Sequence, residues 1–262
     1  MSSTSAPLIQ VDTSAGVTTL TLDSPHNRNA LSTPLMSQLR DALAAAAADD
    51  AVRVVVLDHT GPVFSSGVDL KETEAARAAG AVPAAILADV LGELWDFPKP
   101  VLARVNGPAR AGGLGLIAAA DIVFCSTEAT FAFTEVRLGV IPAVISATVL
   151  RRLPPRAASR LYLTGEVFDG VQAAQAGLVT EAVPPDELDT VVAETCAALV
   201  RGAPQALTGA KQLLRRQPAA TMSDEIAELS ALSVGYFLSD DAREGIAAFR
   251  EKRDPSWVPR QS

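Results

Sequence analysis

A Gly-rich turn within residues 106–122 is the part of the chain best suited to chemistry. It reads Asn-Gly-Pro-Ala-Arg-Ala-Gly-Gly-Leu-Gly-Leu-Ile-Ala-Ala-Ala-Asp-Ile, which predicts an apolar strand, a tight turn and then a helix of small residues. The first amides of a helix lack partners and carry partial positive charge, and glycine lets a ligand approach them closely. Gly112 and Gly113 therefore predict a site for developing negative charge, whereas a plain strand-to-helix turn would use the same glycines for packing alone.

A second turn upstream has the sequence Phe-Ser-Ser-Gly-Val-Asp-Leu over residues 64–70. It follows a strand expected at 52–58, so it should emerge at the same sheet edge as the first turn. Amides from two separate turns can converge on one oxygen and form an oxyanion hole, worth about 3–4 kcal/mol for each donor in studied enzymes. Taken alone, Ser-Ser-Gly is only a turn.

Glu135 is the candidate acid–base residue. It follows the apolar run Thr-Phe-Ala-Phe at 130–133, which should be buried, so its carboxylate is expected at the edge of an apolar pocket. Desolvation raises the pKa of a carboxyl group and makes it a usable acid or base near neutral pH. The alternative is an ion pair at the surface between Glu135 and Arg137.

These candidates require elements that bring them together, and the first half of the chain alternates between strand and helix patterns. β-Branched runs predict strands, and periodic apolar residues predict helices with Ser32 as the N-cap of the first. The expected strands are 16–23, 52–58, 100–105 and 121–126, and the expected helices are 33–48 and 84–95. Such alternation predicts an α/β fold with a mostly parallel sheet.

After Pro142 the strand signals nearly vanish and helical patterns dominate. Asp169 is expected as an N-cap and Gly177 as the residue that ends the same helix. The expected helices are 156–163, 170–176, 187–200, 205–215, 224–238 and 241–252. We therefore predict a core over 1–203 that holds the site and a helical region over 204–262.

Composition excludes several classes of protein. A formal net charge of −8 argues against general nucleic-acid binding, which needs a basic face, but not against one phosphate-bearing small molecule. Two cysteines and two histidines predict neither a disulfide framework nor a metal site, and no metal or separate cofactor is expected. No apolar segment is long enough to cross a membrane, and no targeting segment is recognisable at the N-terminus, so a cytoplasmic protein is expected.

A dinucleotide-binding fingerprint is present only in part. Gly113, Gly115 and Ala118 follow a strand with the spacing of that motif, and Glu135 lies about 20 residues further on. The context does not fit, because the helix must end by about Asp121 and the acidic residue comes after a further apolar run. We therefore set aside a nicotinamide cofactor.

Taken together, the two turns and Glu135 resemble the crotonase superfamily, the enoyl-CoA hydratases and isomerases. The resemblance covers almost the whole chain. It also rests on Ser-Pro-His-Asn-Arg-Asn-Ala-Leu-Ser at 24–32, Leu-Thr-Gly at 163–165, Ala-Ala-Gln-Ala-Gly-Leu-Val at 173–179 and Glu-Gly-Ile-Ala-Ala-Phe-Arg-Glu-Lys-Arg at 244–253.

The resemblance implies a crotonase-like spiral of ββα units with a C-terminal helical trimerisation region, forming a homotrimer or a dimer of trimers. It implies that the amides of Ser66 and Gly112 hold the thioester oxygen and stabilise an enolate, with Glu135 as catalytic acid and base. The substrate would be an acyl-CoA thioester, so that coenzyme A is part of the substrate. The residues implied to contact it are Arg28, Ala30, Val68, Asp69, Leu70, Phe249 and Lys252, the last two from a neighbouring subunit.

One position departs from the hydratases of this family. They carry two glutamates, and the first aligns with Gly115, which has no side chain, so that only Glu135 remains. A single carboxylate can serve first as base and then as acid, and some hydratase-like relatives share both this glycine and the Ile-Pro-Ala-Val-Ile-Ser sequence at 141–146. We predict an enoyl-CoA hydratase. The alternatives are a Δ3,Δ2-enoyl-CoA isomerase, which moves one proton between C4 and C2, and a non-catalytic acyl-CoA-binding relative.

Overall fold

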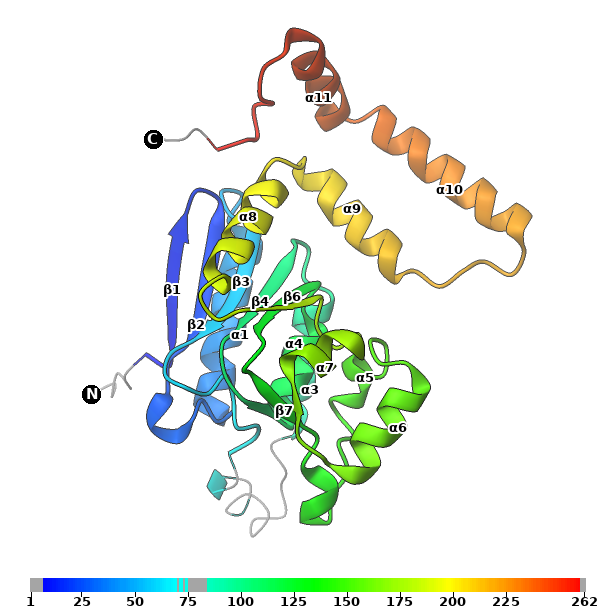
Figure 1. The fold of residues 1–262 in the computed structure, drawn as a ribbon. Helices are drawn as coiled ribbons and strands as arrows, with labels where there is room; N and C mark the ends of the chain where they lie inside the picture. The colour runs from blue at the N-terminus through cyan, green and yellow to red at the C-terminus, as the bar shows by residue number, and fades with distance from the viewer. Residues whose placement is uncertain (1–6, 70, 73, 75–83, 260–262) are drawn as a thin grey trace.

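A six-stranded sheet forms the centre of the molecule (Figure 1). The computed structural model describes residues 7–69, 71, 72, 74 and 84–259. In spatial order the strands are β1 (Ile9–Ser14), β2 (Val17–Leu22), β3 (Val54–His59), β4 (Val101–Val105), β6 (Ile122–Ser126) and β9 (Glu181–Val183). β1 and β2 form an antiparallel pair and all other neighbours are parallel, so β2, β3, β4, β6 and β9 all end at one edge.

Both faces of this sheet are covered, as alternate side chains of its strands require. On one face Val55, Leu57 and Ala103 belong to the main core, which includes apolar residues of α1 (Thr33–Ala48), α3 (Ala84–Trp95) and α4 (Gly112–Ala119). On the other face Val54 and Val56 pack with α8 (Leu188–Val200). The strands are therefore apolar on both sides, which explains why their β-branched runs were recognisable in the sequence.

A second sheet is small and lies beside the first. It contains β5 (Ala109–Arg110), β7 (Thr130–Ala132) and β8 (Phe168–Asp169), with β5 parallel and β8 antiparallel to β7. Four short helical segments and one longer helix connect these strands and their neighbours. They are η1 (Pro25–Asn27), η2 (Glu135–Leu138), α5 (Ser146–Val149), α6 (Pro155–Thr164) and α7 (Gly170–Gln175).

The α/β architecture and the long elements were predicted correctly, and the short strands were not. The Ser32 side chain accepts from the Leu35 amide at the start of α1, and Asp169 forms a capping box with Gln172 at the start of α7. Gly177 has the positive φ of 76° that a helix-ending glycine adopts. β5, β7, β8 and β9 were not predicted, because strands of two or three residues are too short for periodicity to be detected. β1 was also missed, because only Ile9 of its six residues is buried and its sequence therefore has no alternating apolar pattern.

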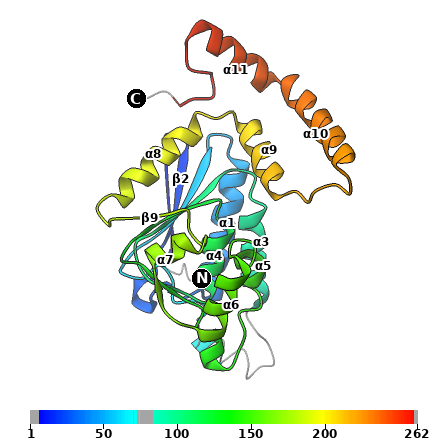
Figure 2. The same ribbon diagram turned by 45° about the vertical axis from the view of Figure 1, so that its right-hand side comes forward.

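The C-terminal helices form an arm that projects from the sheets (Figures 1 and 2). It consists of α9 (Pro204–Arg215), α10 (Met222–Phe237) and α11 (Asp240–Glu251). α9 returns to the core, where Lys211 forms an ion pair with Asp121 at 2.7 Å and donates to the Lys99 carbonyl at 2.9 Å. α10 contains no buried residue. Among the described helices, none is long and apolar enough to span a membrane.

Candidate functional site

Three segments far apart in the sequence run side by side and in the same direction at the site. Ser65 bridges to Ala109 in parallel, and Ala109 is in turn paired with Phe131 through the parallel strands β5 and β7. The Ala111 amide donates to the Ala132 carbonyl at 3.4 Å, which extends this pairing toward α4. The upstream turn and the start of α4 therefore emerge together, as predicted from the sequence, and the segment that leads to Glu135 emerges beside them.

Hydrogen bonding in the upstream turn does not favour Ser66, the residue expected there to donate its amide to a ligand. The Ser66 amide donates to the Arg28 carbonyl at 3.0 Å, and the Gly67 amide donates to Ser65 Oγ at 3.2 Å. Among the described contacts, the Val68 amide has no acceptor. Because the Ser66 N–H is already used within the protein, the geometry favours Val68 rather than Ser66 as the donor that this turn offers to a ligand.

The Val68 amide lies close to Gly112. A Cβ atom built on Gly112 would be 3.7 Å from the Val68 nitrogen, and one built on Gly67 would be 3.4 Å from the Gly112 nitrogen. Gly67 has a φ of +88°, and its Cβ would lie only 2.9 Å from the Cβ of Ala111, so both the backbone conformation and the close approach require glycine. The two turns are therefore nested, with one amide from each at their contact.

The residue before Gly112 has an uncommon backbone conformation. Ala111 is the N-cap of α4 with φ 45° and ψ −117°, values that a residue with a side chain rarely adopts. Gly112 and Gly113 follow as the first residues of the helix, where amides have no partner within the helix. Strained backbone of this kind persists where the surroundings impose it, and here it directs the start of α4 toward the upstream turn.

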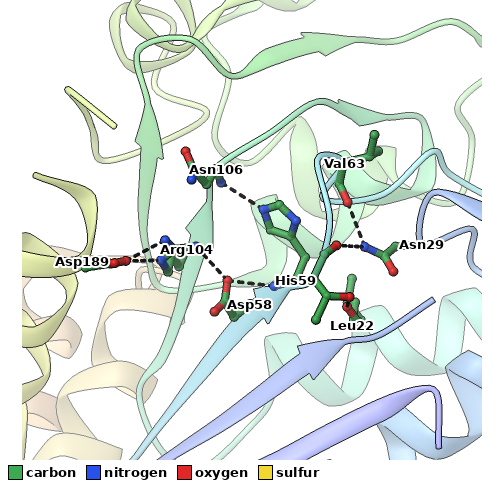
Figure 3. Close-up of polar contacts among 9 residues, drawn as sticks. Leu22, Asn29, Asp58, His59, Val63, Arg104, Asn106 and Asp189 are labelled. Carbon is green, nitrogen blue, oxygen red and sulfur yellow. Dashed lines mark hydrogen bonds and ion pairs between the residues drawn. The ribbon is translucent and has the colours of Figure 1, made fainter. Parts of the chain in front are cut away.

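Asn29 anchors the upstream turn through a fully buried side chain (Figure 3). Its Oδ1 accepts from the Ser24 amide at 2.7 Å, and its Nδ2 donates to the carbonyls of Thr60 at 3.0 Å and Val63 at 2.8 Å. Its own carbonyl accepts from Ser65 Oγ at 2.9 Å. One asparagine thus ties together the loop after β2, the end of β3 and the turn that carries the Val68 amide.

His59 anchors the chain that leads into the Gly-rich turn (Figure 3). The Asn106 amide donates to Nε2 of His59 at 3.1 Å, which requires that nitrogen to be unprotonated. Burial lowers the pKa of His59, and the ring packs edge-on against Phe64. Nearby, Arg104 pairs with Asp58 at 3.1 Å and with Asp189 of α8 at 2.6 Å. This polar cluster joins the edge of the sheet to both turns and to α8.

Glu135 has the environment expected for a proton-transfer group. It begins η2, and its Oε2 is buried without a hydrogen-bond partner among the described residues. Burial raises the pKa of its carboxyl group above the ordinary value. Arg137 does not pair with it, because the Arg137 guanidinium donates to the Thr164 carbonyl at 3.3 Å. Of the two interpretations of Glu135, the structure therefore favours the half-buried carboxyl group.

The space beside Gly115 is filled by apolar side chains. A Cβ built on Gly115 would lie 2.7 Å from Cγ2 of Ile145 and 3.2 Å from Cδ1 of Leu91. Thr148 of α5 donates to the Gly115 carbonyl at 3.2 Å and fixes α5 against α4. A glutamate could not be accommodated at position 115, so a single carboxylate at this place follows from the packing as well as from the sequence.

The residues implied to contact coenzyme A fall into two groups. Arg28, Ala30, Val68 and Asp69 lie together, since Ser66 bonds to Arg28 and the Leu31 amide donates to the Gly67 carbonyl at 2.8 Å. Leu70, the fifth residue implied at this place, lies outside the described residues.

Phe249 and Lys252, the other two implied contacts, lie in the C-terminal arm. Both are at the C-terminal end of α11, where Phe249 is 85% exposed and Lys252 is the C-cap. In both views α11 is at the opposite end of the molecule from α6, which contacts the η2 segment that Glu135 begins (Figures 1 and 2). The two residues are therefore remote from the site of their own chain.

The two sheets, their covering helices and the parallel segments that meet beside Glu135 define a crotonase-type α/β fold. A family model described as "Enoyl-CoA hydratase/isomerase" matches residues 12–260, and the chain belongs to this family.

Relatives and solved structures are similar along nearly the whole chain. The chain is 35% identical to the 2,3-dehydroadipyl-CoA hydratase of Escherichia coli, covering 92% of this chain and 94% of that protein. It is 34% identical to the carnitinyl-CoA dehydratase of Salmonella arizonae, covering 91% and 93%. Pseudomonas aeruginosa AtuE superposes with a TM-score of 0.90 at 32% identity, covering 96% and 100%. These similarities support an enzyme of the hydratase and isomerase class.

Proposed function

We propose that the protein is an enoyl-CoA hydratase that adds water across the 2,3 double bond of an enoyl-CoA thioester. The amides of Val68 and Gly112 hold the thioester oxygen. Glu135 takes a proton from water while the water oxygen bonds to C3, and the electrons of the double bond move onto the thioester oxygen as an enolate. Glu135 then gives the proton to C2 and the carbonyl re-forms. One carboxyl group thus serves as base and then as acid.

The observation that supports this proposal is the parallel pairing of the segment that leads to Glu135 with the segments of the two nested turns. An enolate oxygen needs preorganised donors, and the Val68 and Gly112 amides lie at the contact between the turns. A proton-transfer group needs a pKa near the working pH, and burial shifts the pKa of Glu135 in that direction. The names of the matched hydratase and dehydratase relatives support water addition or removal at an acyl-CoA thioester.

We also propose that the protein is cytoplasmic. We propose that it forms a homotrimer, or a hexamer made of two stacked trimers. α10 buries none of its residues within the chain, and the exposed fraction is 73% for Met222, 58% for Ile226 and 67% for Leu238 beside it. A surface of this kind is expected to be covered by another subunit. The α11 of that subunit would supply Phe249 and Lys252 to the CoA site, since they lie far from the site in their own chain. Light scattering should give three or six chain masses.

A Glu135→Gln variant tests the proposal directly. Loss of the acid–base group should lower kcat for crotonyl-CoA hydration by at least about 100-fold, with little change in KM. Glu128→Gln is the matched control, because Glu128 is exposed in the turn between β6 and β7. Near-normal turnover by Glu135→Gln would refute the assigned role. Tight binding of CoA esters without any turnover by the wild type would instead favour a non-catalytic acyl-CoA-binding protein.

A Δ3,Δ2-enoyl-CoA isomerase is the second candidate, favoured by the packing around Gly115. Moving one proton between C4 and C2 needs a single carboxyl group, and Ile145 and Leu91 leave no room for another at position 115. The two activities are separated by assaying the wild type with a 2-enoyl and a 3-enoyl thioester. Conversion of the 3-enoyl ester to the conjugated ester without hydration of crotonyl-CoA would assign the isomerase.

A further inference from the structure

Aliphatic side chains surround the start of α4, where the acyl group of the substrate must begin. A Cβ built on Gly112 would lie 3.0 Å from Cδ1 of Leu31 and 3.4 Å from Cδ2 of Leu87. Gly112 is the donor proposed for the thioester oxygen, so these two leucines border the first carbons of the acyl chain. Leu31 is 1% exposed and Leu87 is 4% exposed, which leaves them little freedom to move aside.

One helical turn further along α4, aliphatic side chains again lie against the helix. Gly115 lies three residues after Gly112, and there Ile145 and Leu91 occupy the space that a side chain on Gly115 would need. Leu91 is 3% exposed and projects from α3, while Ile145 immediately precedes α5. An acyl chain extending from the Gly112 amide along α4 therefore meets these two side chains within a few carbons.

Behind Leu91 lies a groove of about 420 Å³ between α3 and α5. Small or apolar residues line most of it, including Ala88 and Gly92 of α3, Ala147 of α5, and Ala143 and Val144 before α5. A Cβ built on Gly92 would have nothing within 4 Å, so the groove is open at this point. Leu91 and Thr148 border both this groove and Gly115, so the Leu91 side chain lies between the groove and the site.

We propose that Leu91 is the end wall of the acyl pocket and restricts the enzyme to short, uncharged acyl groups. This inference rests on the proposed function, because it takes the thioester oxygen to lie at Gly112. An acyl group of about four carbons fits in front of Leu91, and a longer chain reaches the groove only if Leu91 is truncated. Among the described neighbours of Gly112 and Gly115, Leu31, Leu87 and Ile145 offer no group that could pair with a terminal carboxylate, so dicarboxylic acyl groups are disfavoured as well.

The experiment measures kcat/KM for 2-enoyl esters and Kd for saturated esters, each with four-carbon and ten-carbon chains. The wild type should prefer the short chain by at least about tenfold in both quantities, the scale of discrimination that an apolar pocket achieves. Leu91→Ala should raise kcat/KM and affinity for the ten-carbon chain at least about tenfold. Leu91→Met, similar in volume, should behave as the wild type. A thermal melt establishes that each variant is folded.

A second variant tests the groove as the destination of the longer chain. In the Leu91→Ala background, Gly92→Phe should fill the groove and remove the gain for the ten-carbon chain, whereas Gly92→Ala should keep it. Equal use of both chain lengths by the wild type, or a folded Leu91→Ala variant without the gain, would overturn the proposal. So would a Gly92→Phe variant that changes the oligomeric mass rather than chain-length preference, because a second copy would then occupy the groove.

The same measurements separate this inference from the proposed function. Chain-length selection in the Kd values without hydration of any ester would refute the hydratase and leave the role of Leu91 supported. Hydration without chain-length selection would support the hydratase and refute the role of Leu91. Absence of binding to both esters would overturn the two proposals together.

Discussion

The turns around the site and the C-terminal arm differ in how their groups are accommodated. Polar groups of the turns are buried and paired, whereas apolar side chains of the arm are exposed. Around the turns, Asn29 and Ser65 are fully buried and nearly every amide from Phe64 to Gly67 has a partner from another segment. In the arm, α10 buries none of its residues, although Ile226 and Phe237 are apolar. The first region is specified by contacts within one chain, whereas the second has apolar surface that the described residues of its own chain leave uncovered.

This difference shows that a group without a partner has a different meaning in each region. In the turns most amides are paired, so the amides of Val68 and Gly112, for which the described residues supply no acceptor, are the candidates for binding a ligand. In the arm many apolar side chains are exposed together, which is the pattern expected of the assembly surface that we propose. The predictions below test this contrast, beginning with the largest expected effect.

Asn29→Ala should destabilise the fold most. It leaves the Ser24 amide and the carbonyls of Thr60 and Val63 without the Asn29 side chain, and it puts alanine at a φ of 51°. Because each buried group left unpaired costs about 1–3 kcal/mol, we expect a loss of about 3–5 kcal/mol in the free energy of unfolding. Urea denaturation measures it, with the exposed arm residue Ser230→Ala as control. A loss below about 1 kcal/mol would show that the turn does not depend on this anchor.

Ile226→Asp should affect assembly and leave the folding of the core unchanged. Ile226 is 58% exposed on α10, so a charge costs little in the isolated chain but would be desolvated if another subunit covers the helix. Light scattering should show dissociation to smaller species, while Ser230→Asp, an equal charge at an exposed polar position of the same helix, should assemble normally. If Ile226→Asp keeps the wild-type mass, α10 is not an assembly surface and the contrast between the regions fails.

The same contrast explains what could be read from the sequence. Helix α1, its Ser32 cap and the capping box at Asp169 depend on local patterns and were placed within a residue or two. The nested turns were also foreseen, since glycines and strand ends are visible in the sequence. The hydrogen bond made by the Ser66 amide was not foreseen, because its acceptor, the Arg28 carbonyl, belongs to a residue 38 positions away.

The packing of side chains into the space beside Gly115 could not be predicted from the sequence either. A missing glutamate can be seen in the sequence, but the packing of Leu91 and Ile145 against the glycine is a property of three helical segments that meet in space. Local chemistry was therefore predictable, whereas the partners that long-range folding brings to it were not.

His59 offers a smaller test of the buried region through pH. Burial lowers the pKa of His59, so the unfolded chain binds a proton more readily than the folded one. Stability should be unaffected above the ordinary pKa of 6.5 and should fall as pH decreases below it, by at most about 1.4 kcal/mol for each pH unit. In His59→Gln this part of the pH dependence should be absent, whereas His26→Gln, at an exposed position, should retain it. Identical profiles for wild type and His59→Gln would contradict the anchoring of Asn106.

Glu135 should give the smallest effect on stability, and with the opposite dependence on pH. Its pKa is raised by burial, so the folded state favours the protonated form, and stability falls as pH rises from the ordinary pKa of 4.5 through the raised value. Glu135→Gln should therefore be more stable than the wild type at pH 8, by on the order of 0.5 kcal/mol because the side chain is only half-buried, and equal to it below pH 4.5. Thermal melts at the two pH values measure this difference, with Glu128→Gln as control. A variant less stable than the wild type at pH 8 would mean that the Glu135 carboxylate stabilises the fold. It would contradict a carboxylate that lowers the stability of the fold and serves proton transfer.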